Sequence, residues 1–170
     1  MSLHDQLAQK KAAITKLWFD AVINTYSAET TRFLRNQNDP FANPVGQTTL
    51  QNLGALVELL IDEKDLAQAE PLLDPIIRIR AIQDFTAARA VKFVFDLKGV
   101  IRSQISQLDD EKNRSQLALL EDRLDELVLM AFDVYMRCRE KIYELKANDV
   151  RNRTFKAFAR AGLIKEPEQD

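Results

Sequence analysis

The sequence is poor both in the residues that interrupt regular secondary structure and in those that build chemical sites. Among its 170 residues are four glycines, five prolines, one cysteine and one histidine. So few glycines and prolines cannot supply the turns of an all-β fold, and Cys138 alone excludes an internal disulfide framework. The chain also lacks an apolar segment long enough to span a bilayer and the apolar N-terminal run of a signal peptide. We therefore expect a cytoplasmic, all-α protein without membrane insertion.

The charge balance gives no sign of a polyanionic partner. The chain carries 24 basic and 26 acidic side chains, for a net charge of −2. A protein without a strong positive field is not drawn to nucleic acid, and we expect no nucleic-acid partner. With 46% hydrophobic residues the length suits one domain with an ordinary core. We predict a single domain over residues 1–162 and a flexible tail over residues 163–170.

The residue inventory argues against three chemical functions that helical domains of this size often have. Haem of the globin type needs a histidine on a core helix, but His4, the one histidine, lies near the N-terminus. Glu-x-x-His pairs, which hold di-iron centres in ferritin-like bundles, do not occur. Catalysis through Cys138 would need an activating base such as an inward-facing histidine. We therefore predict no enzymatic activity, cofactor or metal.

One long helix, spanning at least residues 117–146, organises the predicted fold. No glycine or proline interrupts this stretch, and its start is expected near Asp109 and Asp110, or later at Asn113 or Ser115. Apolar residues at alternating steps of three and four form a continuous seam on one side. We predict that the helix meets both the domain's own core and a partner, with a dimer or partner interface at Leu120, Leu124, Leu127, Ala131, Val134 and Cys138.

The rest of the chain predicts a compact bundle of about five to seven helices in total. We expect a first helix over residues 3–26, a short one capped by Ser27, and a last short one over residues 148–162. Gly162 suits the position just past that helix. Asn43-Pro44 and Asp74-Pro75 resemble a cap followed by a first helical proline, and Thr86 suits the cap of a helix that packs beside the long one.

Two features have more than one interpretation. Phe41 lies in a stiff loop with Asn43 and Pro44, which is a candidate partner-binding loop, although we favour Phe41 as a plug at the end of the bundle. Gly99 interrupts a helix at a cost of about 1 kcal/mol. A close helix crossing is the favoured explanation, and a kink or a small ligand near the backbone is the alternative.

Three stretches together resemble a known family: residues 39–46 (DPFANPVG), residues 77–85 (IRIRAIQDF), and residues 125–127 with 131–143 (DEL and AFDVYMRCREKIY). The chain resembles the N-terminal domain of RsbRD, a co-antagonist of the kinase RsbT in the bacterial stressosome. The resemblance implies a helical sensor domain, with related N-domains that are globin-like, dimeric and free of haem. It also implies a following STAS output domain, for which the chain leaves no room before Asp170.

Our leading hypothesis is accordingly a non-enzymatic regulatory or sensory domain that acts through protein contacts. We expect it to be a homodimer with a further, unidentified regulatory protein partner. Similarity to single-domain relatives in bacteria with anaerobic sulfur metabolism implies an alternative, a redox-linked accessory protein that uses Cys138. A small buried apolar side chain is the simpler interpretation of that cysteine. A third hypothesis is an apolar small-molecule binding module near Gly99.

Overall fold

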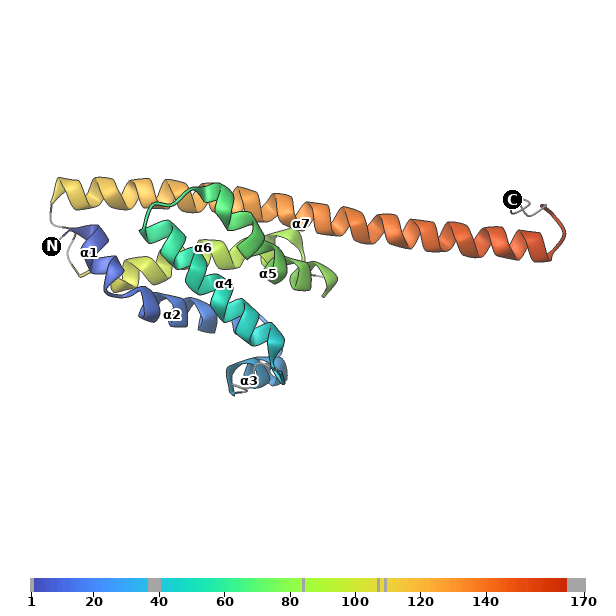
Figure 1. Cartoon of the computed structure of the whole chain (residues 1–170), viewed down its shortest axis with the longest axis horizontal. Coiled ribbons are helices and arrows are strands. Elements are labelled where there is room, and N and C mark those ends of the chain that lie inside the picture. The colour runs from blue at the N-terminus through green and yellow to red at the C-terminus, as the bar shows by residue number, and fades with distance from the viewer. Residues whose placement is uncertain (1, 37–40, 84, 107, 109, 165–170) are drawn as a thin grey trace.

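The chain folds into a helical bundle from which one helix projects far beyond the rest (Figure 1). The computed structural model describes residues 2–36, 41–83, 85–106, 108 and 110–164. Every regular element in those residues is a helix, which confirms the predicted all-α class. The elements in chain order are α1 (Leu3–Ala8), α2 (Lys11–Ile23), α3 (Ala28–Asn36), α4 (Pro44–Ile61), η1 (Leu66–Ala69), α5 (Glu70–Ile82), α6 (Ala87–Gln104) and α7 (Glu111–Arg160).

Several predicted helix boundaries are confirmed by the hydrogen bonds at the helix ends. The side chain of Asn43 accepts a hydrogen bond from the Gly46 amide at the start of α4, and Thr86 does the same for Arg89 in α6. Asp110 caps α7 by accepting from the Asn113 amide; Asp109 lies outside the described residues. A side-chain acceptor at the N-cap satisfies amides that have no partner inside the helix.

The predicted C-terminal signal at Gly162 is also confirmed. Gly162 has a φ of 71°, and its amide donates to Ala159 O while the Leu163 amide donates to Phe158 O. These two bonds form the Schellman arrangement that commonly ends helices at a glycine. The end of α7 is therefore encoded by a local residue choice.

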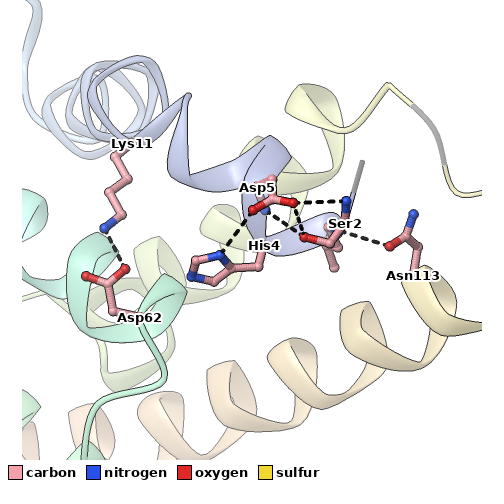
Figure 2. Close-up of polar contacts among 7 residues, drawn as sticks. Ser2, His4, Asp5, Lys11, Asp62 and Asn113 are labelled. Atoms are coloured by element: carbon pink, nitrogen blue, oxygen red, sulfur yellow. Dashed lines mark hydrogen bonds and ion pairs between the residues drawn. The ribbon is translucent and has the colours of Figure 1, made fainter.

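The predicted first helix over residues 3–26 is wrong, because the chain turns between α1 and α2. Lys10 leaves the helical conformation, with φ −112° and ψ 8°, and its Nζ donates to Gln104 O at 2.5 Å. The turn directs α1 toward α7, where the Leu3 amide donates to Asn113 Oδ1 at 2.9 Å (Figure 2). A tertiary contact thus overrides the helical periodicity.

Two other predicted boundaries are wrong. Asp74 does not cap a helix, because α5 already begins at Glu70 and contains Pro75 in its interior; Asp74 instead pairs with Arg78. The predicted separate helix over residues 148–162 does not exist, since α7 runs unbroken for 50 residues. Its length is about 75 Å at 1.5 Å per residue.

The core lies between the first part of α7 and the helices α2, α4, α5 and α6. As predicted, α6 and α7 are neighbours, and α5 packs on α7 to a similar extent. Trp18 of α2 is fully buried, stacks on Phe93 of α6 and donates its indole N–H to Phe93 O at 2.7 Å. The buried tryptophan therefore joins two helices without leaving its polar atom unpaired.

Gly99 has a different setting from the one we favoured. A Cβ built at this position would meet nothing within 4 Å. Gly99 is exposed in α6, so a close helix crossing does not explain it and the prediction is wrong.

Candidate functional site

The seam of α7 lies inside the molecule. Leu124, Leu127 and Ala131 are fully buried, and the seam belongs to the same core cluster as residues of α2, α4, α5 and α6. Of the predicted interface residues, Leu120, Leu124, Leu127, Ala131 and Val134 are buried against the chain's own helices, and Cys138 is half-buried. Helices α5 and α6 of the same chain already cover the apolar side on which we expected a partner.

A second apolar surface lies on the other side of α7. We define the outer stripe as the large apolar side chains of α7 that share one exposed side; their exposed fractions lie between 38% and 67%. At about 100° per residue they occupy one narrow sector, roughly opposite the seam. The outer stripe consists of Leu129, Phe132, Met136, Tyr143, Val150 and Phe158.

The outer stripe continues along a part of α7 that the rest of the described chain covers only at its start, where Ile142 packs against the core cluster. We define the arm as residues 141–160, which project past the bundle in Figure 1. Every residue from 143 to 158 is exposed. The arm begins where Arg139 donates from Nη1 to Ala81 O at 2.9 Å and from Nη2 to the Tyr143 hydroxyl at 2.8 Å. A long helix with an uncovered apolar stripe is suited to pairing with another helix.

Sequence reasoning found the outer stripe only in part. Phe132 and Tyr143 are visible beside the seam as apolar residues that widen it, and Val150 and Phe158 as the inward side of the separate last helix that we predicted. Leu129 and Met136 escaped notice. The signal that finds them is a second set of apolar residues recurring about every seven positions on the opposite side of the helix.

Cys138 lies where the covered part of α7 gives way to the arm. Its side chain is half-buried and lines a groove between α5 and α7 together with Asp74 and Arg137. Burial, and then the negative charge of Asp74, raise the pKa of the Cys138 thiol above its ordinary value. A raised pKa favours the unreactive neutral thiol, because the thiolate is the nucleophile. The arrangement agrees with the simpler interpretation of Cys138 as a packing residue.

The loop before α4 holds one exposed aromatic residue. Phe41 is 96% exposed, so our favoured interpretation of it as a plug at the bundle end is wrong. Asn43 is buried and donates from Nδ2 to Leu34 O at 3.0 Å, which makes it a structural residue of the loop. Pro44 is exposed. Of the predicted partner-binding loop, Phe41 and Pro44 present surface; residues 39 and 40 lie outside the described residues.

A buried guanidinium at the junction of α2, α5 and α6 was not predicted. Arg80 is fully buried, and its charge is 5.0 to 5.3 Å from the ring centres of Tyr26, Phe85 and Phe93. Its Nη2 donates to Val22 O and to the Thr25 hydroxyl, at the C-terminal end of α2. Burial lowers the pKa of Arg80. The partial negative charge of the helix end and the aromatic faces compensate the buried cation.

The described part of the chain contains no group of three or more histidine, cysteine or acidic residues placed to hold a metal ion. Among the described helices, none has an apolar stretch sufficient to cross a membrane.

These observations define the class of protein: a helical domain with a covered core and an exposed apolar helix surface. The chain belongs to the family of RsbT co-antagonist protein RsbRD N-terminal domains, whose family model matches residues 12–150. This match confirms the resemblance described above. Comparison with curated proteins and with solved structures gives no match.

Proposed function

We propose that this chain is a non-enzymatic regulatory domain that pairs with a second copy of itself along the outer stripe of α7 and so presents a joint surface to a regulatory protein. The observation that supports the proposal most is the continuity of the outer stripe from above the bundle into the arm. A surface that runs along one straight helix can pack against the same surface of a second copy when a two-fold axis relates the two copies.

The position of the outer stripe supports pairing in another way. The bundle covers the seam side of α7, so a second helix approaching the opposite side meets no other element of the bundle. Contiguous exposed apolar surface of this kind commonly marks an interaction site. The resemblance to dimeric stressosome N-domains points to the same occupant.

The test compares two double variants by light scattering across a range of protein concentrations. Tyr143→Glu with Val150→Glu places two charges on the outer stripe, whereas Asn148→Glu with Asn152→Glu places two charges on the other side of the arm. We expect wild type and the Asn variant to be dimers. We call the variant with Tyr143→Glu and Val150→Glu the stripe variant. We expect its dimer dissociation constant to be at least about a hundredfold higher than that of wild type, because its dimer would bury two unpaired charges on each chain.

Circular dichroism of each variant is the control for folding. The proposal fails if wild type is monomeric at every concentration, or if the stripe variant dimerises as tightly as wild type. An equal loss of dimer affinity in both double variants would also contradict the proposal, because the loss would then follow from added charge alone.

The alternative of a redox-linked accessory protein has weaker support. It needs a reactive thiolate at Cys138, whereas burial and Asp74 raise the pKa of that thiol. No observation on the described residues favours it over protein contact, and we do not propose it as a second function.

A further inference from the structure

A pocket lies between α1, the end of α4 and the first third of α7. Its volume is about 440 Å³, within the range of small-molecule pockets. The floor is apolar and formed by buried side chains, with the exposed Leu119 at the rim. The floor residues are Leu3, Leu7, Leu60, Ile61 and Leu120.

The wall formed by α1 is held in place at both ends. Figure 2 shows Asn113 of α7 bound to the start of α1, and Lys11, just after α1, paired with Asp62 at 2.6 Å. The side chain of Gln6 accepts hydrogen bonds from the Ser106 amide and hydroxyl. The pocket is therefore built by long-range contacts, and Gly99, near which we had considered a ligand, does not line it.

The rim of the pocket carries an excess of negative charge. Glu63, Asp122 and Glu126 line it together with one guanidinium, that of Arg123, and the imidazole of His4. No ion pair of these three carboxylates is found among the described residues, although their neighbours Glu121 and Asp125 pair with Arg102 and Lys98. Asp122 and Glu126 are four residues apart on one helix, a spacing at which like charges repel.

Unpaired polar atoms are also concentrated in this wall. Three buried side-chain atoms without a hydrogen-bond partner are found in the described residues, and two of them, Gln116 Oε1 and Arg123 Nε, belong to residues that line the pocket. An unsatisfied buried polar atom is destabilising and calls for an explanation. A rotation of the Gln116 amide that turns Oε1 into the pocket would let a ligand's hydrogen-bond donor satisfy it.

We propose that this pocket binds a small organic cation: a primary or secondary ammonium group on an aliphatic or aromatic skeleton. The skeleton packs on the leucine floor. The ammonium lies among the carboxylates of Glu63, Asp122 and Glu126, where it relieves their mutual repulsion and donates to Gln116. The inference goes beyond the pairing of two copies, because the pocket lies on α7 before the outer stripe begins.

The backbone conformation at Glu63 allows a substitution that removes its carboxylate and keeps the fold. Glu63 has a φ of 52°, and the Glu63 and Lys64 amides donate to Leu60 O and Leu59 O at the end of α4. Glycine is the residue preferred at this position. Glu63→Gly therefore removes a carboxylate from the pocket without weakening the fold, which separates loss of binding from loss of structure.

The experiment uses hexylammonium as the probe, with hexanol and hexanoate as matched ligands, in titrations of the full chain followed by amide chemical shifts. We expect saturable binding of hexylammonium with shifts at residues 116–126, and binding of hexanol and hexanoate weaker by about tenfold or more, as for the loss of a charged hydrogen bond. The proposal would be overturned if hexylammonium shifted only amides outside residues 116–126, or if its binding did not saturate at millimolar concentration. Binding of hexanol as tight as that of hexylammonium would also overturn it.

Two variants complete the test. Glu63→Gly with Glu126→Gln removes two carboxylates from the pocket and is expected to weaken hexylammonium binding by about tenfold or more. Asp133→Asn with Glu140→Gln removes two exposed acids of α7 outside the pocket and is expected to bind like wild type. Equal weakening in both variants contradicts the site. The stripe variant with Tyr143→Glu and Val150→Glu should bind as wild type does, so failure of dimerisation and failure of the pocket are distinguishable.

Discussion

The two parts of α7 have the same helical backbone but opposite surroundings. Before Cys138 the seam is fully apolar and covered: Leu124 and Leu127 are fully buried. Beyond Cys138 the same spacing of three and four residues reaches the half-buried Ile142 and then Leu145, Asn148 and Asn152, which are all exposed. The comparison shows that a heptad-like spacing tells which residues lie on the same side of a helix. Whether the chain's own helices cover that side depends on how apolar the residues at those positions are.

The largest expected difference between the two parts is in the cost of removing a leucine. Leu127→Ala should lower the free energy of unfolding by about 2–5 kcal/mol, because it leaves a cavity in the core. Leu145→Ala should change it by less than about 0.5 kcal/mol, because the side chain is exposed in the arm. Denaturant unfolding at one fixed protein concentration measures both values. A comparable loss in Leu145→Ala would mean that something covers the seam side of the arm in solution.

Two tyrosines give a smaller and more specific difference. The Tyr135 hydroxyl donates to Phe85 O in the buried part, whereas the exposed Tyr143 hydroxyl accepts from the half-buried Arg139. Tyr135→Phe should lower the free energy of unfolding by about 1–2 kcal/mol, because the Phe85 carbonyl is left unpaired and buried. Tyr143→Phe should change it by less than about 0.5 kcal/mol.

The same denaturant titration compares these two variants, with circular dichroism confirming that both fold. A Tyr143→Phe loss as large as that of Tyr135→Phe would show that the arm is not independent of the bundle. Such a result would blur the distinction between the covered and the exposed part of α7.

The smallest expected effect concerns Cys138, at the boundary of the two parts. Its pKa is raised in the folded chain by burial and Asp74, so the folded state keeps the thiol proton to higher pH than the unfolded state. The stability that the protonated Cys138 thiol contributes is therefore fully present below the pKa of the thiol in the unfolded chain, about 8.5. It is lost as the pH rises through the higher pKa of the thiol in the folded chain.

The rate of alkylation by iodoacetamide near pH 8.5 measures how far the folded chain suppresses the thiolate of Cys138. The folded chain should react more slowly than the chain unfolded in denaturant, and Asp74→Asn should speed the reaction of the folded chain, because it removes a charge that disfavours the thiolate. Faster alkylation of the folded wild type than of the unfolded chain would contradict the prediction and revive the redox hypothesis for Cys138.

Local signals were predictable and tertiary ones were not. The caps at Asn43, Thr86 and Asp110 depend on one side chain and an amide three residues away, and the Gly162 end depends on one left-handed residue; all four are visible in the sequence. The turn at Lys10 was missed because its cause, the contact with Gln104, lies 94 residues further along the chain.

Of the candidate sites, the sequence indicated one long helix and missed which side of it is free. Phe41 shows the same difficulty in a loop, since an aromatic residue between prolines serves equally as a plug or as exposed surface. Arg80 was detectable, because it follows Leu73, Ile76 and Ile77 on one side of α5, but its aromatic surroundings come from α2, α6 and the α5–α6 connection.

The sequence by itself determined the all-α class, the ends of most helices and the family of this protein, because each depends on residues close together in the chain. Only the tertiary structure decided that α5 and α6 cover the seam, that the outer stripe and arm of α7 stay exposed, and that α1 completes a pocket with an acidic rim. The physical reason is that an apolar helix side gains the same free energy from its own chain as from another molecule, so its partner depends on how distant segments meet.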